Sequence, residues 1–354
     1  MGQRPTNCCY TMESETLVAK GSALGCCCWV MLVLTYIFVS IVLLKNPSIL
    51  HKKKKPKFTC VHISHRGGAF ERLENTMEAF EHAVHDCGTD MLEIDVHLTL
   101  DKQVVVNHDL SLLRTTGIDK NINQLNYKDF PPLCSSLDVE FMDGKPCNPM
   151  REGIDRRIPL LRDVFERFPT IPMNIDIKDN DDELIEAVHS LIEEFGRQEL
   201  TVWGNISYTV TQKCYKRNPS IPIFFSAARV ALLAFFAWTG LLPFVPLRET
   251  CLAILHPIAL ERNSEFRQAA ISNRLYWVAL KVIDLILMRP FIFDHLRKRG
   301  IQVFFWVFND KEGFARGYEL GATGVMTDCP TLLQTYLKHN PHIVTSRKQG
   351  ANID

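Results

Sequence analysis

Two carboxylates separated by one residue, Glu93-Ile94-Asp95, are the feature of this sequence best suited to chemistry. They lie in an apolar stretch, Met91–Leu98, with the composition of a β-strand. Strand side chains alternate between two faces, so both acids point to one face and Ile94 to the other. Paired acids repel unless a cation lies between them, and all-oxygen ligation favours Mg²⁺ or Ca²⁺. A salt-bridged pair on an edge strand is the alternative interpretation.

A histidine, an arginine and two glycines, His65-Arg66-Gly67-Gly68, directly follow another β-rich segment. Histidine exchanges protons near neutral pH, and arginine holds two phosphate oxygens. The glycines let the main chain approach a ligand closely. Together these residue types are typical of phosphate chemistry, although the tetrapeptide alone is a weak motif.

Two further strand ends carry polar residues of the same kinds. The apolar strand Val104–His108 ends in a second histidine, which we interpret as a second proton-transfer group. In Asp176-Ile177-Lys178 the period-two spacing places an acid and a positive charge on one face. We expect Asp176 to be a third metal ligand and Lys178 to bind phosphate.

These residues require a scaffold that brings several strand ends together. Short β-rich segments alternate with helical ones through the chain, which favours parallel β/α units and an α/β fold of the (β/α)8 TIM-barrel type. Active sites of such barrels lie at the carboxyl ends of the strands. Nine strands are predicted, so one must lie outside the eightfold pattern: Cys60–Ser64, Met91–Leu98, Val104–His108, Met173–Lys178, Leu200–Gly204, Ile221–Ser226, Leu252–His256, Gln302–Phe308 and Gly324–Thr327.

An uncharged segment near the N-terminus, residues 24–44, is long enough to cross a bilayer core at about 1.5 Å per residue. We interpret it as a transmembrane anchor; a cleaved signal peptide is the alternative. Lysines at 45, 52–55 and 57 follow it, whereas Arg4 and Lys20 before it are offset by Glu13 and Glu15. This asymmetry predicts a cytosolic catalytic domain.

The predicted organisation has five parts: a tail at 1–23, the anchor at 24–44, a basic juxtamembrane linker at 45–59, a barrel at 60–338 and a tail at 339–354. Residues 110–157 lack periodicity and are interpreted as an insertion above the barrel mouth. Residues 227–247 form a membrane-associated apolar segment interrupted by Gly240, Pro243 and Pro246. A hairpin or helix dipping into one leaflet is favoured over a crossing, which would divide the barrel. A third apolar stretch, 275–293, suits an interfacial helix or a core helix equally well.

Charge balance and cysteine spacing bear on the expected partners and on the redox state of the compartment. Lysine plus arginine equal aspartate plus glutamate at 40 each, and no basic stripe is present, so nucleic acid is not an expected partner. The 12 cysteines form no C-x-x-C pair, which indicates free thiols in a reducing compartment. Those at 8, 9 and 26–28 are candidates for palmitoylation. The sequon Asn205-Ile206-Ser207 argues against a cytosolic catalytic domain, because such triplets are glycosylation acceptors in secreted proteins.

Five motifs in order resemble the glycerophosphodiester phosphodiesterase family over residues 61–338: His65-Arg66-Gly67, Glu74-Asn75-Thr76, Glu93-x-Asp95 with Thr99, His108-Asp109 and Thr327-Asp328-Cys329-Pro330. With the anchor and the apolar segments, the chain is most similar to the membrane-bound branch, which acts as a lysophospholipase D. The resemblance implies a (β/α)8 fold and one divalent metal, Mg²⁺ or Ca²⁺, held by Glu93, Asp95 and Asp176. It also implies His65 and His108 as acid and base.

Two positions depart from that family pattern. The family usually has glutamate where this chain has Asp176, which shortens the ligand by one methylene. Its tryptophan-threonine-valine-asparagine run is replaced by Trp306-Val307-Phe308-Asn309. Trp306 is kept, and we expect it either to line the substrate groove or to pack in the barrel core.

The expected reaction is metal-dependent hydrolysis of a lysoglycerophospholipid to lysophosphatidic acid and the head-group alcohol, at the endoplasmic reticulum or another intracellular membrane. Arg66, Lys178 and the metal would neutralise the phosphate, and His65 and His108 would divide proton transfer. The nucleophile would be water or the substrate's own 2-hydroxyl. Hydrolysis of water-soluble glycerophosphodiesters to glycerol 3-phosphate is the main alternative. A phospholipase C-type enzyme and a non-catalytic lipid-binding barrel are weaker ones.

Overall fold

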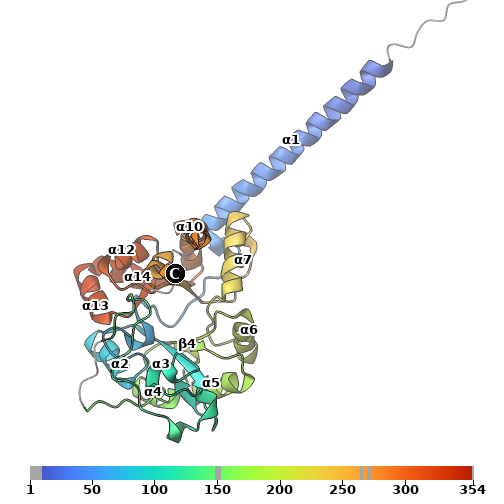
Figure 1. The fold of residues 1–354 in the computed structure, drawn as a ribbon. Coiled ribbons are helices and arrows are strands. Elements are labelled where there is room, and N and C mark those ends of the chain that lie inside the picture. Colours follow the sequence, from blue (N-terminus) through green and yellow to red (C-terminus); the bar gives the residue numbers. More distant parts are fainter. Residues whose placement is uncertain (1–9, 148–152, 264–265, 269–272, 353–354) are drawn as a thin grey trace, which may run out of the picture.

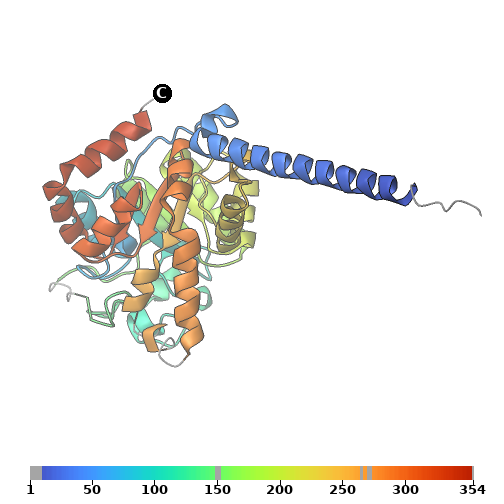
Figure 2. The ribbon, with the colours of Figure 1, turned by 90° about the horizontal axis from the view of Figure 1, so that it is seen from above.

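The computed structural model describes residues 10–147, 153–263, 266–268 and 273–352. Figure 1 shows one rounded body of strands and helices from which a single long helix, α1 (Tyr10–Lys45), projects. In the view from above (Figure 2) the same helix again extends away from the body. The predicted tail residues 1–9 and the cysteines at 8 and 9 lie outside the described residues.

A parallel sheet of seven strands curls into a nearly closed barrel, in the order β5-β4-β2-β1-β8-β7-β6. This confirms the predicted TIM-type architecture. The strands of this path are β1 (His62–Ser64), β2 (Met91–Leu98), β4 (Met173–Ile177), β5 (Thr201–Gly204), β6 (Cys251–Leu255), β7 (Gln302–Trp306) and β8 (Gly324–Thr327).

Residues 221–226, another of the predicted strands, fill the gap between β5 and β6 and so take the eighth position of the barrel. Isolated bridges join Trp203 to Ile223 and Phe224 to Cys251. Backbone bonds from Trp203 to Pro222 (3.0 Å) and from Phe225 to Cys251 (3.1 Å) support them. The segment thus occupies a barrel position without forming a regular strand.

One of the nine predicted strands lies outside the barrel, as expected, and it is Val104–His108. Strand β3 (Val104–Val106) pairs antiparallel with β2, opposite Val96, His97 and Leu98, and lies outside the barrel path. Parallel strands need a crossover connection of about a dozen residues, and residues 99–103 are too few for one. A hairpin is the connection that this length permits, and β3 is the surplus ninth candidate.

Helices surround the barrel, and helix α5 shows how the sequence produces one. Its amide at Glu183 donates to the Asp181 side chain (2.9 Å), an N-cap, and the following apolar positions bury one face. The other helices are α2 (Met77–Glu81), α3 (Leu113–Thr116), α4 (Leu161–Arg167), α5 (Asp182–Glu194), α6 (Tyr208–Arg217), α7 (Ala227–Trp238), α8 (Pro257–Arg262), α10 (Arg274–Leu287), α11 (Pro290–Lys298), α12 (Lys311–Glu319), α13 (Pro330–His339) and α14 (Pro341–Asn352).

Short 3₁₀ and π turns complete the chain: η1 (Pro47–Ile49), η2 (His65–Gly67), η3 (His82–Asp86), η4 (Ile122–Gln124), η5 (Tyr127–Asp129), η6 (Gln198–Leu200) and η7 (Leu242–Phe244). The barrel core includes Ile63, Met91 and Phe304, all at most 1% exposed. The insertion at 110–157 supplies Leu112 and Ile122 to a separate apolar cluster, which also contains Ala69, Leu73 and Val105.

Helix α1 contains the segment Cys28–Lys45, which is long and apolar enough to cross a membrane by length and composition. Its C-terminal half packs on the turn that follows α7. The hydroxyls of Tyr36 and Ser40 donate to the carbonyls of Thr239 and Gly240, both at 2.6 Å. Near the end of α1, the Leu44 carbonyl accepts a hydrogen bond from the His295 ring (2.8 Å). The helix is therefore fastened to the body at its base.

The basic linker also packs on the body. The Lys54 amide donates to the Arg299 carbonyl (2.9 Å), and its ammonium donates to the carbonyls of Arg248 (2.6 Å) and Glu249 (2.9 Å). Burial lowers the pKa of Lys54 to about 8. The base of α1 is thus connected to the barrel by an ordered segment.

The apolar segment 227–247 folds as a hairpin made of α7 and η7. At 12 residues, α7 is shorter than the roughly 20 residues that a bilayer core requires. The Arg229 guanidinium, at its start, pairs with the Glu249 carboxylate (2.6 Å), beyond the hairpin's end. Both ends of the hairpin therefore lie on the same side of the molecule.

Candidate active site

A cavity of about 480 Å³ lies at the carboxyl ends of the barrel strands. All eight residues that the sequence singled out line it: His65, Arg66, Glu93, Asp95, His108, Asp176, Lys178 and Trp306. The remaining wall is largely apolar and comes from β6 and from helices α7, α8 and α10. Polar chemistry and an apolar surface therefore share one space.

His65 follows β1 and is held by an aspartate that directly follows the neighbouring strand β8. Its Nδ1 donates to Asp328 Oδ1 (2.6 Å), while Nε2 lies 3.9 Å from Glu93 Oε2. Burial opposes protonation of the ring, but the Asp328 carboxylate outweighs it, and the pKa of His65 is raised. The ring also stacks on Trp306, with centroids 6.4 Å apart. His65 is thus fixed with Nε2 toward the acids.

The three predicted metal ligands come from two neighbouring strands. In the pairing of β2 with β4, Asp95 lies opposite Asp176, and Glu93 lies one step earlier on the same face. The Lys178 ammonium lies between the two aspartates, 2.8 Å from Asp95 Oδ1 and 2.7 Å from Asp176 Oδ2. The lysine predicted to bind phosphate thus pairs with two of the acids.

The electrostatics of this group fit a cation. Burial, and then the neighbouring Asp95 charge, raise the pKa of Glu93 to about 7. Asp95 is also buried, but Lys178, His108 and Arg66 outweigh that effect and lower its pKa. An all-oxygen donor set with one carboxylate that lacks a full countercharge suits Mg²⁺ or Ca²⁺. A cation shared by all three acids would displace the Lys178 ammonium from its present position.

The backbone at Arg66 adopts a left-handed conformation that brings this residue close to the same acids. Its φ of 49° lies in the left-handed region, and Gly67 and Gly68 follow with φ of 81° and 100°. This turn lets the Arg66 amide donate to Glu93 Oε2 (3.0 Å). The guanidinium lies 3.3 Å from Glu74 and 3.6 Å from Asp95. Gly67 has no space for a side chain, because an added Cβ would lie 2.7 Å from Phe80.

His108 reaches the cavity by way of the hairpin, not as a parallel strand end. The Asn107 amide donates to the Asp95 carbonyl (3.0 Å), which returns the chain to the predicted metal ligands. The His108 ring donates from Nδ1 to Asp109 Oδ1 (2.6 Å), and Arg114 holds the other Asp109 oxygen (2.6 Å). With Nδ1 engaged, Nε2 is the nitrogen that can exchange a proton with a ligand.

Several residues that orient the site were not assigned a role from the sequence. Asp328 holds His65, and its second oxygen accepts a hydrogen bond from Asn309 (2.9 Å). The Asn205 amide donates to Asp176 Oδ1 (2.7 Å), and the residue is only 8% exposed. The sequon at Asn205 therefore presents no free acceptor for a glycan. Asp328 belongs to the family motif Thr327-Asp328-Cys329-Pro330, but no sequence pattern apart from the sequon drew attention to Asn205.

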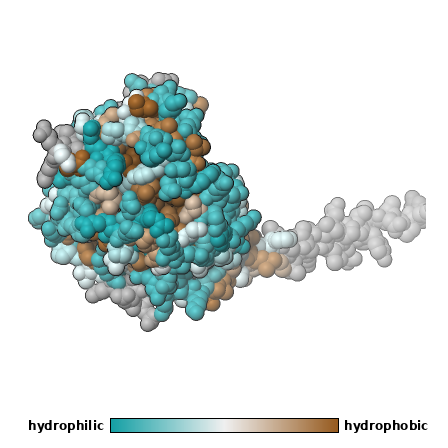
Figure 3. Space-filling model, turned by 90° about the horizontal axis from the view of Figure 1, so that it is seen from below, coloured by the Kyte–Doolittle hydropathy of each residue, from teal (hydrophilic) through white to brown (hydrophobic). Residues whose placement is uncertain are grey.

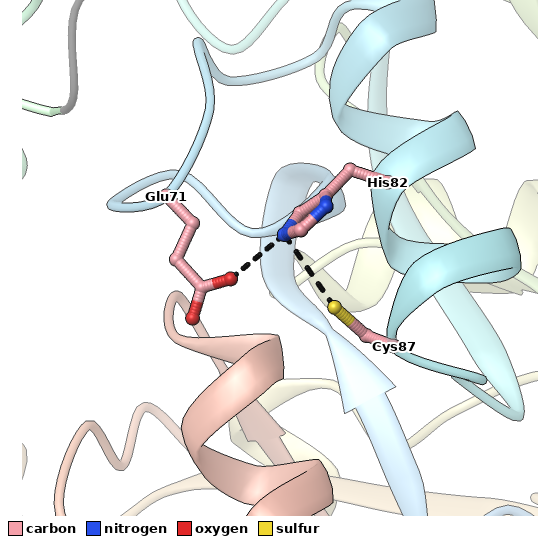
Figure 4. Close-up of side chains that lie close together, drawn as sticks. All are labelled: Glu71, His82 and Cys87. Atoms are coloured by element: carbon pink, nitrogen blue, oxygen red, sulfur yellow. Dashed lines mark hydrogen bonds and ion pairs between the residues drawn. The ribbon is translucent and has the colours of Figure 1, made fainter.

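A second cluster of possible metal ligands lies outside the cavity. In Figure 4, Glu71 and Cys87 point toward the His82 ring; its Nε2 lies 2.9 Å from Glu71 Oε2 and 3.5 Å from Cys87 Sγ. Ligand atoms of the three residues lie within 4.8 Å of one another. Thr331 also donates to Glu71 (2.6 Å), so hydrogen bonds tie the loop to the start of α13. None of the predicted ligands belongs to this cluster.

A parallel barrel with paired acids, histidines and cationic side chains at its strand ends defines a phosphodiester hydrolase. Residues 65–332 match the glycerophosphoryl diester phosphodiesterase family, and the chain belongs to that family. It is 51% identical over 306 residues to the human protein named Lysophospholipase D GDPD1, covering 86% of this chain and 94% of that one. Human Lysophospholipase D GDPD3 is 37% identical, covering 88% and 96%.

The barrel is also similar to a solved structure of the family. The crystal structure of the glycerophosphodiester phosphodiesterase from Agrobacterium tumefaciens str. C58 superposes with a TM-score of 0.54 at 17% identity. The match covers 78% of this chain and 99% of that one. At this identity the likeness concerns the fold.

Proposed function

We propose that this protein is a lysophospholipase D, which hydrolyses a lysoglycerophospholipid to lysophosphatidic acid and the head-group alcohol. The observation that carries the proposal is the composition of the cavity, in which the acids and histidines share one space with apolar side chains of α7, α8 and α10. A soluble glycerophosphodiester offers no surface for such a wall, whereas an acyl chain does. The names of the two human relatives support the same substrate class.

We assign the chemical roles from the positions of the side chains. His65 and His108 each have Nδ1 engaged by a carboxylate, which leaves both Nε2 atoms for proton transfer to and from the substrate. Arg66 and Lys178 supply positive charge for the phosphate, and Trp306 borders the groove beside His65. The stacking of Trp306 on His65 supports a place in the groove more than one in the barrel core.

Glu93, Asp95 and Asp176 are the proposed ligands of one divalent cation, Mg²⁺ or Ca²⁺. When bound, the cation supplies charge neutralisation at the phosphate. Asn75 and Asn205 orient two of these acids, through hydrogen bonds of 2.9 Å to Asp95 and 2.7 Å to Asp176. The cluster of Glu71, His82 and Cys87 is not assigned to catalysis, because none of the three lines the cavity.

Product analysis by mass spectrometry tests the proposal. The purified full chain is incubated with palmitoyl lysophosphatidylcholine and, separately, with glycerophosphocholine, in Mg²⁺, in Ca²⁺ and in excess chelator. We expect lysophosphatidic acid and choline from the first substrate, and only when a cation is present. Phosphocholine as product would identify phospholipase C-type cleavage, and cleavage of glycerophosphocholine alone would identify the soluble-substrate alternative.

The nucleophile is tested with a lysolipid whose 2-hydroxyl is methylated. If that hydroxyl attacks the phosphorus and forms a cyclic phosphate, the methylated substrate is not turned over. Undiminished turnover identifies water as the nucleophile.

We further propose that α1 spans an intracellular membrane, such as that of the endoplasmic reticulum, with the catalytic domain in the cytosol. The lysines that follow the helix support this orientation. The eight cysteines described as free thiols and the buried Asn205 agree with a reducing compartment without glycosylation. Protease digestion of sealed microsomes should degrade the barrel, whereas protection would reverse the orientation.

A further inference from the structure

Helix α10 has apolar side chains on two opposite faces. Leu280, Ile283 and Leu287 follow a helical spacing and line the catalytic cavity. On the opposite face lie Leu275, Val278, Val282 and Leu285, whose exposed fractions are between 44% and 72%. A helix on the surface of a soluble domain needs one apolar face only. The outer face of α10 therefore requires an apolar environment of its own.

Helix α7 repeats this arrangement beside α10. Ala227 and Val230 line the cavity, while Phe235 and Trp238 are 56% and 55% exposed. The Trp238 indole donates to the Ile286 carbonyl of α10 (2.9 Å), which joins the two helices. In Figure 1 both helices lie at the end of the body from which α1 projects, and Figure 3 shows hydrophobic side chains near the base of α1.

The contacts of α1 indicate how deeply the α7 hairpin reaches. Tyr36 and Ser40 bond the turn after α7 at Thr239 and Gly240. With residues 24–44 as the span, Tyr36 lies eight residues inside its end, or about 12 Å at 1.5 Å per residue. A leaflet core is about 15 Å thick. With α1 placed as the proposed membrane span, the tip of the hairpin would lie about 12 Å inside the hydrocarbon of one leaflet.

We propose that the acyl chain of the lysophospholipid is held by the cavity-facing side of α7 and α10, the two helices whose outer faces are also apolar. The proposal rests on the lysophospholipase D function proposed above and adds its chain-binding subsite. An acyl chain that passes from lipid to an apolar wall avoids exposure to water along the whole path. Its phosphate then meets Arg66, Lys178 and the acids at the other end of the cavity.

The test narrows the subsite and compares two substrates. Leu280→Trp fills the cavity-facing side of α10, where Leu280 is 4% exposed. Leu285→Trp is the matched control on the outer face of the same helix, where the residue is 59% exposed. The full chain is reconstituted in phosphatidylcholine vesicles, and kcat/KM is measured for palmitoyl lysophosphatidylcholine and for glycerophosphocholine, which has no acyl chain.

We expect Leu280→Trp to lower kcat/KM for the lysolipid at least ten-fold more than it lowers kcat/KM for glycerophosphocholine. For Leu285→Trp, we expect the ratio of the two kcat/KM values to stay as in the wild type. Val230→Trp narrows the other wall without replacing a buried core residue, and keeps the test decisive if Leu280→Trp does not fold. We expect it to lower kcat/KM for palmitoyl lysophosphatidylcholine more than kcat/KM for a lysophosphatidylcholine with a shorter acyl chain. Parallel losses on both substrates, or an unchanged lysolipid rate in both cavity variants, would overturn the subsite. A wild-type protein inactive on all lysolipids would instead overturn the proposed function itself.

Discussion

At the scale of single residues, the site depends on carboxylates that hold the two histidines in a defined orientation. Asp328 engages His65, and Asp109 engages His108, both at 2.6 Å through Nδ1. A carboxylate in this position fixes which ring nitrogen carries a proton and stabilises the charged ring. The catalytic role proposed for each histidine therefore depends on a partner that does not itself contact the substrate.

Replacing Asp328 by asparagine should expose the role of His65. Because Asp328 raises the pKa of His65, its neutralisation should lower that pKa and reduce kcat/KM about 10- to 100-fold. If His65 must be protonated to act as the acid, the alkaline limb of the pH profile moves to lower pH. If it must be neutral to act as the base, the acidic limb moves to lower pH instead.

The control for Asp328→Asn is Asp86→Asn, which removes a similar carboxylate from His82, at 2.9 Å and outside the cavity. We expect this variant to keep the wild-type profile. Pure positioning by Asp328, without an effect on proton transfer, would appear as a lower rate with both limbs unmoved, and would refute the proposed role of His65.

Replacing Glu93 by glutamine tests the metal site. Loss of one anionic oxygen ligand should raise the Mg²⁺ or Ca²⁺ concentration for half-maximal activity at least ten-fold. Chelator should abolish wild-type activity and added cation should restore it. Glu71→Gln, in the cluster outside the cavity, is the matched control. A shift in cation requirement with Glu71→Gln but not with Glu93→Gln would move the metal to that cluster.

Much of the site could be predicted from strand periodicity, and the rest required the fold. The face shared by Glu93 and Asp95 follows from spacing alone, and so does their convergence with Asp176 once parallel strands are assumed. The Lys178 ammonium between two aspartates depends on a side-chain conformation that no sequence pattern specifies. Asn205 directly follows the neighbouring strand β5, and its contact with Asp176 depends on the pairing of β4 with β5.

At the scale of elements, the length of a connecting loop determines whether an apolar segment becomes a parallel barrel strand or the antiparallel partner in a hairpin. Val104–Val106 has the apolar composition of a buried barrel strand, but the short connection after Leu98 makes it an antiparallel partner of β2. Residues 221–226 have the composition of a strand as well, yet Pro222 lacks the amide that a regular ladder needs. The sequence predicted the barrel correctly, but it did not identify the strand outside the barrel, and it did not predict that residues 221–226 form only isolated bridges.

The apolar hairpin of α7 yields a prediction at this scale. Phe235→Glu places a charge on a side chain that is 56% exposed and that we place in the leaflet. A charge inside the hydrocarbon costs about 2–3 kcal/mol, so the hairpin should withdraw toward the surface. We expect kcat/KM for lysolipid in vesicles to fall about ten-fold.

Ile118→Glu is the matched control for Phe235→Glu, since Ile118 is 46% exposed and lies two residues beyond the end of α3. Figure 1 shows α3 in the part of the body away from α1. It should leave the rate on vesicles unchanged. Equal effects of the two substitutions would show that the hairpin is in water.

At the scale of the whole molecule, helix α1 is joined to the body that contains the catalytic cavity by several hydrogen bonds. The base of α1 is fastened by bonds to the α7 turn and to α11, and the linker is bonded to the loop before β6. The cavity wall formed by α7 and α10 lies at the same end of the body as α1 (Figure 1). With α1 as the proposed membrane anchor, the enzyme would meet its lipid in the membrane that holds it.

The folded molecule should lose stability in weak acid because it buries neutral histidines. Burial lowers the pKa of both His62 and His256 to about 4, against partial opposition from Asp90 and Asp284 respectively. His256 Nδ1 also accepts the Ile258 amide (3.2 Å), which requires an unprotonated nitrogen. Between pH 6.5 and about 4 the unfolded chain therefore binds protons that the folded chain does not, and the free energy of unfolding falls as pH falls.

Each of these two histidines should contribute a loss of up to about 3 kcal/mol over that range, since one pKa unit corresponds to about 1.4 kcal/mol. The measurement is the midpoint of thermal unfolding in detergent from pH 7.5 to 4. His62→Gln should flatten the slope below pH 6.5, because glutamine takes up no proton there. His339→Gln, on an exposed part of α13, is the control and should keep the wild-type slope. A His62→Gln midpoint that still falls as steeply as the wild type would assign the acid sensitivity to other groups.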